Sequence, residues 1–81
     1  MTTFKIYTMD NCSYCEQAKS LLRNRNIEYN ETNVGKDISR ADFLNQYPAQ
    51  RTLPMILMDG QRLGGLNELT KHLNHSLSNQ G

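Results

Sequence analysis

The pattern of the first 34 residues constrains the fold more than any other feature of this chain. Phe4 to Thr8 alternates and mixes aromatic with β-branched residues, which is typical of a strand. Residues 13–26 place apolar side chains at helical spacing, and residues 27–34 alternate again. A strand, a helix and another strand in this order predict a right-handed βαβ unit with parallel strands. Asp10 and Asn11 are the expected turn and capping residues between the first strand and the helix.

A short second helix is expected after this unit. Residues 35–38 form a connector that leads to Ser39, which with Asp42 three residues later resembles a capping box. The helix is predicted over residues 40–47, and Pro48 ends it because proline cannot continue a helix.

The remaining residues predict a hairpin and a last helix. Asp59-Gly60 is a strong two-residue turn signal, because glycine accepts the positive φ that such turns require. Gly64-Gly65 is a backbone break, and a stripe of leucines follows it: Leu66, Leu69, Leu73 and Leu77. The predicted elements are a strand over 52–58, a returning strand over 61–63, a helix over 67–77 and a frayed tail over 78–81.

The predicted order is therefore β-α-β-α-β-β-α, in a single domain over residues 1–81. A parallel pair of strands extended by an antiparallel hairpin gives a four-stranded mixed sheet with helices packed on its faces. This is an α/β, thioredoxin-like arrangement. A chain this short buries only about 60–65% of its unfolded surface, so we expect a thin core.

The composition excludes several classes of function. With 37% hydrophobic residues, 21% charged residues and a net charge of +1, it is that of an ordinary globular domain. There is no basic stripe interleaved with aromatics, so nucleic acid is not an expected partner. No apolar run approaches membrane-spanning length and the first residues lack an apolar signal region, so we expect no membrane association and a cytoplasmic protein.

Two cysteines, Cys12 and Cys15, lie two residues apart where the first helix is predicted to begin. A permanent disulfide is unexpected in a reducing compartment, and it would close too small a loop to restrict the unfolded chain. A closed zinc site needs four ligands, and only His72 and His75 could complete it. A solvated helix face explains these histidines, so we predict no metal site. A reversible redox couple is the favoured interpretation.

The two cysteines have different predicted roles. A helix N-terminus offers unpaired N–H groups and a partial positive charge, which favour the reactive thiolate at Cys12. Cys12 is the expected nucleophile, and Cys15, one turn further on, is expected to resolve the mixed disulfide. The nearby charges act in both directions, because Asp10 and Glu16 oppose a thiolate whereas Lys19, one turn beyond Cys15, supports one, and the sequence leaves the balance between them open.

Three segments together resemble the glutaredoxin family over nearly the whole chain: Cys12-Ser13-Tyr14-Cys15, Gln50-Arg51-Thr52-Leu53-Pro54 and Gly64-Gly65-Leu66-Asn67-Glu68-Leu69. The resemblance implies a glutathione-dependent thiol-disulfide oxidoreductase that reduces protein disulfides and glutathione mixed disulfides. It implies glutathione as co-substrate, no tightly bound cofactor, and a monomer. Ribonucleotide reductase is a customary client of the family.

The resemblance also predicts a glutathione site of Tyr14, Gln50, Arg51, Thr52, Leu53, Pro54, Gly65, Leu66 and Asn67. In the family, the proline is cis and the preceding backbone, here Leu53, binds the cysteinyl part of glutathione. Leu66 through its N–H and Asn67 through its side chain match the γ-glutamyl subsite, unless Asn67 only caps the helix. Arg51 and Gln50 match the subsite of the glycyl carboxylate, unless they belong to a solvated loop. Tyr14 flanks the site in the family, or is a partly packed aromatic.

Two departures from the family pattern leave alternatives open. Met9 stands where many glutaredoxins have a lysine, which removes one expected cation. Ser13 stands where many have proline, and some members with serine resemble carriers in which two subunits hold a [2Fe–2S] cluster through Cys12 and glutathione. A glutaredoxin-like protein reduced by thioredoxin reductase is the third alternative.

Overall fold

The computed structural model describes residues 2–78, and side chains up to Asn74. Its sheet has four strands in the order β2-β1-β3-β4. The inner strand β1 (Phe4–Thr8) pairs in parallel with β2 (Tyr29–Asn33) and antiparallel with β3 (Met55–Met58). The other inner strand, β3, pairs antiparallel with β4 (Gln61–Gly64). The predicted mixed sheet and the predicted element order are confirmed.

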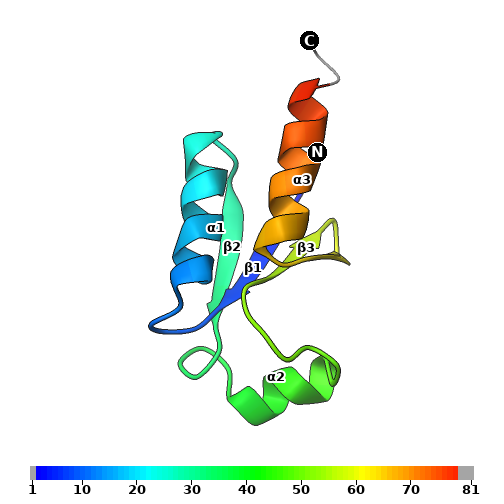
Figure 1. Ribbon diagram of the computed structural model, residues 1–81. Helices are drawn as coiled ribbons and strands as arrows, with labels where there is room; N and C mark the ends of the chain where they lie inside the picture. Colours follow the sequence, from blue (N-terminus) through cyan, green and yellow to red (C-terminus); the bar gives the residue numbers. More distant parts are fainter. Residues whose placement is uncertain (1, 79–81) are drawn as a thin grey trace.

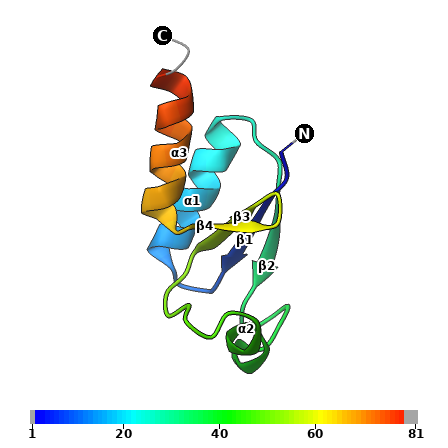
Figure 2. The same cartoon turned by 90° about the vertical axis from the view of Figure 1, so that its right-hand side faces the viewer.

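Three helices accompany the sheet: α1 (Ser13–Asn24), α2 (Arg40–Gln46) and α3 (Leu66–Ser78). Figures 1 and 2 show α1 and α3 side by side along one face of the sheet, with α2 beyond the end at which α1 begins. Within residues 2–78, no helix is both long enough and apolar enough to cross a membrane.

The larger core lies between the sheet and the helices α1 and α3. Alternation along β1 points Phe4 and Ile6 to this face and Tyr7 to the other. The buried residues of this core are Phe4, Ile6, Ala18, Leu22, Ile56, Leu69 and Leu73. The predicted leucine stripe of the last helix is thereby confirmed for Leu69 and Leu73, with Leu66 partly buried; the side chain of Leu77 lies outside the described part.

A smaller core covers the other face of the sheet. Tyr7, Phe43, Met55 and Leu57 are its buried members. The ring of Tyr7 lies 5.2 Å from that of Phe43 and 5.7 Å from that of Tyr47, measured between centroids. Phe43 is the one residue of α2 that is buried, so these aromatic contacts are what hold α2 against the end of the sheet.

The first helix and the second strand are shorter than predicted. The first helix was predicted to Asn26 but ends at Asn24, because Asn26 adopts a left-handed conformation with φ of 58°. The second strand is shorter than 27–34: it begins at Tyr29, and Val34 forms only an isolated bridge with Ile38.

The later elements differ by a few residues at their ends. The third strand begins at Met55 rather than at residue 52, because the chain bends through a cis Leu53–Pro54 peptide before it. The short helix ends at Gln46, one residue earlier than expected, and Ser39 caps its start as predicted by accepting a hydrogen bond from the N–H of Asp42 at 3.0 Å. The last helix includes Leu66 and Ser78, so the predicted frayed tail begins no earlier than residue 79 and lies outside the described residues.

The larger core should dominate stability. We expect Leu22→Ala, at a fully buried position of α1, to lower the free energy of unfolding by about 2–5 kcal/mol, because it removes contacts and leaves a cavity. Urea denaturation measures the change. Leu21→Ala, next to it but only partly buried, is the matched control and should cost about 1 kcal/mol. Equal losses in the two variants would contradict this assignment of the core.

Candidate active site

Cys12 is the N-cap residue of α1. Its backbone is extended, with φ of −114° and ψ of 102°, and its Sγ accepts a hydrogen bond from the N–H of Cys15 at 3.2 Å. The expectation that Asp10 and Asn11 cap the helix is therefore wrong, since the cysteine does so itself. Asn11 supplies the turn before it, at a left-handed φ of 59°, which asparagine tolerates better than most residues.

The two cysteines form a disulfide, with their Cα atoms 5.2 Å apart. Cys12 is half-buried, whereas Cys15 is 0% exposed and lies on the same helix side as Ala18 and Leu22. A reactant in solvent can therefore reach the sulfur of Cys12 but not that of Cys15. This asymmetry fits the predicted roles of nucleophile and resolving residue.

The segment before β3 lies against Cys12. The Leu53–Pro54 peptide is cis, as the family resemblance implied. The carbonyl oxygen of Leu53 lies 3.6 Å from Sγ of Cys12. Residues 41 positions apart in the chain are thus brought together at the start of α1.

A groove of about 500 Å³ begins at this segment and extends to the start of α3; we call it the α3 groove. It contains every predicted glutathione-site residue except Arg51. Its lining is Tyr14, Gln50, Thr52, Leu53, Pro54, Arg62, Gly64, Gly65, Leu66, Asn67 and Glu68. Tyr14 is 64% exposed, so the alternative of a packed aromatic does not hold.

Arg51 lines a second groove, of about 390 Å³, on the other side of the same segment; we call it the α2 groove. Gln50, Thr52 and Leu53 line both grooves and form the ridge between them. The lining of the α2 groove is Met9, Val34, Gly35, Arg40, Phe43, Leu44, Gln50, Arg51, Thr52 and Leu53. Met9, at the position where a lysine was expected, therefore shares this groove with Arg51.

Arg62 is a groove residue that the sequence reasoning missed. Its Nη1 donates a hydrogen bond to Oε1 of Gln50 at 3.1 Å, and Nε2 of Gln50 donates to the carbonyl oxygen of Thr52 at 2.7 Å. This bridge ties β4 to the segment that carries Leu53. Gln50, predicted as a ligand of the glycyl carboxylate, has its side-chain amide engaged within the protein.

Glu68 is the other groove residue that the sequence reasoning missed, and its position explains why residue 64 is a glycine. The N–H of Gly65, the residue before α3, donates to Oε1 of Glu68 at 2.8 Å, which is half of a capping box. This bond from Gly65 lowers the pKa of the Glu68 carboxyl. A Cβ on Gly64 would lie 2.5 Å from Cγ of Glu68, so the glycine makes room for the capping side chain. Asn67, the second residue of α3, is not at the cap position, which removes the alternative of a capping role.

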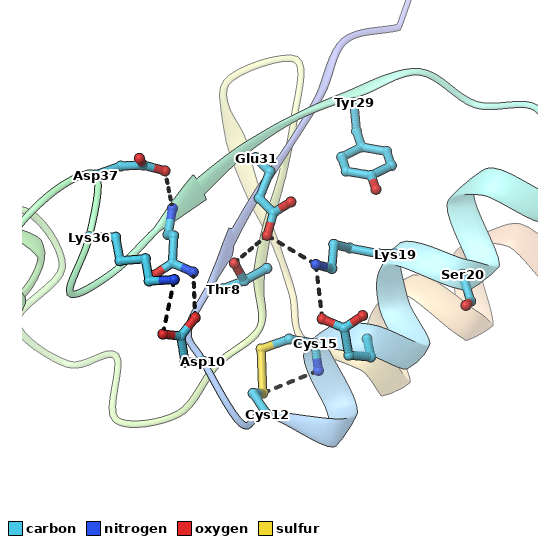
Figure 3. A network of polar contacts seen from close by, with 12 residues as sticks. Thr8, Asp10, Cys12, Cys15, Lys19, Ser20, Tyr29, Glu31, Lys36 and Asp37 are labelled. Atoms are coloured by element: carbon cyan, nitrogen blue, oxygen red, sulfur yellow. Dashed lines mark hydrogen bonds and ion pairs between the residues drawn. A yellow bond between two sulfur atoms is a disulfide. The ribbon is translucent and has the colours of Figure 1, made fainter.

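A network of charged groups lies beside the disulfide, and Figure 3 shows it above Cys12 and Cys15. The hydroxyl of buried Thr8 donates to Oε2 of Glu31 at 2.6 Å. Nζ of Lys19 lies 3.2 Å from the same oxygen and 2.9 Å from Oε2 of Glu16. Lys19, which was expected to support the thiolate, is thus already paired with two carboxylates, and the bond to Glu16 contributes most to raising its pKa.

The negative charge of Asp10 is likewise balanced by neighbouring groups. Its carboxylate accepts a hydrogen bond from Nδ2 of Asn33 at 3.2 Å and lies 3.3 Å from Nζ of Lys36. The bond from Asn33, followed by that from Lys36, lowers the pKa of Asp10. Cys12 borders an open hollow with these groups, but their charges are largely balanced. The thiolate therefore depends on the helix terminus more than on a neighbouring cation.

The described residues offer no candidate metal site. Among the described residues, no group of three or more histidine, cysteine or acidic side chains is arranged to hold an ion. His72 is half-buried on α3, and the side chain of His75 lies outside the described part.

We expect Glu31 to stabilise the fold only above acidic pH. The bond from Thr8 lowers the pKa of Glu31 in the folded protein below its value in the unfolded chain, so its contribution is complete at neutral pH and is lost as the pH falls below about 4. The difference in unfolding free energy between the native protein and Glu31→Gln, from urea denaturation at pH 7 and pH 3, should therefore shrink toward zero at pH 3. Glu28→Gln, at an exposed residue outside the network, should show no such pH dependence. A difference that persists at pH 3 would contradict this account.

Comparison with known proteins identifies the family. A sequence profile described as Glutaredoxin matches residues 4–63. Glutaredoxin 3 of Escherichia coli (strain K12) is 29% identical over 69 residues, covering 85% of this chain and 83% of its own. The probable glutaredoxin of Acanthamoeba polyphaga mimivirus is 33% identical over 82 residues, covering 88% of this chain and 77% of its own.

Solved structures of glutaredoxins have the same fold as this chain. The chain superposes on Glutaredoxin 1 from Francisella tularensis with a TM-score of 0.82 at 28% identity, covering 96% of this chain and 99% of that one. It matches the fold of the buckwheat glutaredoxin–glutathione complex with a TM-score of 0.74 at 24% identity, covering 95% and 74% of the two chains. With its profile match, its relatives and its Cys12–Cys15 pair at the start of α1, the chain belongs to the glutaredoxin family of thiol-disulfide oxidoreductases.

Proposed function

We propose that this protein is a glutathione-dependent oxidoreductase that reduces protein disulfides and glutathione mixed disulfides through Cys12 and Cys15. The observation that carries the proposal is the place of Cys12: its reachable sulfur caps α1 and lies 3.6 Å from the Leu53 carbonyl, beside the ridge that separates the two grooves. The cytoplasm, where the glutathione pool is reducing, is the setting we propose.

The reaction on a glutathione mixed disulfide takes two exchanges. The Cys12 thiolate attacks the glutathionyl sulfur, which forms a Cys12–glutathione disulfide and releases the client as a thiolate. A second glutathione thiolate then attacks that glutathionyl sulfur, which yields glutathione disulfide and returns the Cys12 thiolate. The N–H of Cys15, 3.2 Å from Sγ of Cys12 in the oxidised pair, is positioned to donate to the thiolate each time it is released.

The reaction on a protein disulfide uses both cysteines. Cys12 attacks one client sulfur, and the Cys15 thiolate then attacks Cys12, which releases the client dithiol and leaves the Cys12–Cys15 disulfide. Two glutathione molecules supply the electron pair that reduces it. The first opens the disulfide at Cys12 and frees Cys15, and the second removes the first as glutathione disulfide.

Glutathione would span the ridge between the grooves in this proposal. Its cysteinyl main chain would lie along Leu53, with the sulfur at Cys12. Its γ-glutamyl carboxylate would enter the α3 groove, where the first-turn N–H groups of Leu66 and Asn67 have no helix carbonyl to bond. Its glycyl carboxylate would lie toward Arg51, and the buckwheat relative, solved as a glutathione complex, supports the ligand class.

Two measurements separate this proposal from the alternatives. Reduction of the disulfide by glutathione alone, compared with thioredoxin reductase and NADPH, identifies the electron donor. A carrier of a [2Fe–2S] cluster would instead be purified as a coloured dimer that bleaches on oxidation, whereas the proposed monomeric enzyme is colourless.

We expect the two cysteine variants to behave differently. Cys12→Ser should lose all activity on a small glutathione mixed disulfide, in an assay coupled to glutathione reductase, because the remaining thiol, Cys15, is buried and out of reach of the substrate. Cys15→Ser should keep most of that activity, since free glutathione replaces the resolving thiol, but should lose dithiol-dependent reduction of protein disulfides. Equal loss in both variants would overturn this division of roles.

Arg51 should contribute to the affinity for glutathione. Arg51→Gln is expected to raise the KM for glutathione about three- to tenfold, because it removes the cation proposed for the glycyl carboxylate. The matched control, Arg23→Gln, changes an arginine near the opposite end of α1 and should leave the KM unchanged. An unchanged KM in Arg51→Gln would show that this carboxylate binds elsewhere.

A further inference from the structure

The α2 groove has a chemical character that glutathione does not explain. Its lining is mainly apolar, with Val34, Phe43 and Leu44 from the smaller core and its borders. Two arginines, Arg40 and Arg51, are exposed at its edge. A tripeptide that ends at a glycyl carboxylate has no side chain to place against this apolar lining.

We propose that the α2 groove binds the segment of a client protein that follows its reactive cysteine, and that it favours a bulky apolar residue together with acidic residues. The proposal rests on the proposed function, because it concerns the client that is disulfide-linked to Cys12. It defines a class of protein substrate by the residues beside the cysteine.

The position of the groove supports this assignment. A client cysteine joined to Cys12 must lie at the ridge, because Leu53 approaches Sγ of Cys12 and lines both grooves. If the client main chain runs as proposed for glutathione, the residues before its cysteine point to the α3 groove and those after it to the α2 groove. An extended chain spans about 3.3–3.6 Å per residue, so the next two or three residues reach the α2 groove.

The charges favour an acidic segment. Neither Arg40 nor Arg51 forms an ion pair among the described residues, and the groove has no acidic side chain in its lining. The open hollow on the other side of Cys12 is different, since its charged groups already pair with one another and it contains several carboxylates. A client segment with Asp or Glu is therefore attracted to the α2 groove, and attraction between exposed charges weakens as salt rises.

An exchange equilibrium tests the proposal directly. The Cys15→Ser protein is loaded with glutathione at Cys12 and mixed with a peptide thiol. The peptide thiolate attacks Cys12 and releases the glutathione thiolate, so the step involves no net oxidation. Mass spectrometry gives the equilibrium constant for three peptides: Gly-Gly-Cys-Leu-Glu-Glu, its counterpart with Leu-Glu-Glu before the cysteine, and Gly-Gly-Cys-Gly-Ser-Ser.

The equilibrium constant for loading the first peptide should be about tenfold larger than that for either of the other two. This preference should decrease as the salt concentration rises from 0.05 to 0.5 M. Leu44→Ser and Arg40→Gln, each in the Cys15→Ser protein, should each reduce that preference about threefold, while loading of the Gly-Ser-Ser peptide stays unchanged. Arg40 is exposed, so its variant tests the groove even if Leu44→Ser fails to fold. Arg23→Gln is the control and should leave every constant as it is.

Each failure has its own meaning. If Cys12 does not form a mixed disulfide with glutathione, the proposed function fails. If it does, but the three peptides load equally well, or the variants do not alter the preference, only the proposal for the groove is overturned. A change in the oligomeric state of the free protein on Leu44→Ser, without any peptide preference, would show that a second copy of the chain covers the groove and would also overturn it.

Discussion

The packing of α1 on the sheet is the interaction on which the site depends. Cys15, Ala18 and Leu22 recur along one side of this helix and are completely buried. Because Cys15 is itself part of this buried row, the first turn of α1 cannot shift without disturbing the core. Cys12, one turn earlier on the same helix, is held at the surface by the same contacts. The hydrophobic effect that folds the domain thus also sets which of the two sulfurs meets solvent.

The second half of the site comes from a distant part of the chain. The segment that carries Leu53 and Pro54 lies beside Cys12 and is tied to β4 through Gln50 and Arg62. Polar bonds and the packing of Leu53 on the smaller core together hold this segment, whereas apolar contacts hold α1. The grooves on its two sides differ in character, because one ends at the polar start of α3 and the other opens beside the smaller core.

Much of this arrangement follows from local sequence patterns. Alternation and helical spacing predict the order of all seven elements, because each buries one face and the period shows which. The partners of charged side chains do not follow from such patterns. Lys19 was expected beside the thiolate, but it pairs with Glu31 on β2, twelve residues away, through a contact that only the parallel register creates. Gly65-x-x-Glu68 could have revealed the helix cap, since this spacing is that of a capping box.

The complete burial of Cys15 has a consequence for the order of events in turnover. Every electron pair that enters or leaves the protein must pass through one outer atom, the sulfur of Cys12. Donor and acceptor cannot both be joined to that atom, so the protein must release one before it takes up the other. A domain of this size thereby enforces strict alternation between its two reactants without any moving part.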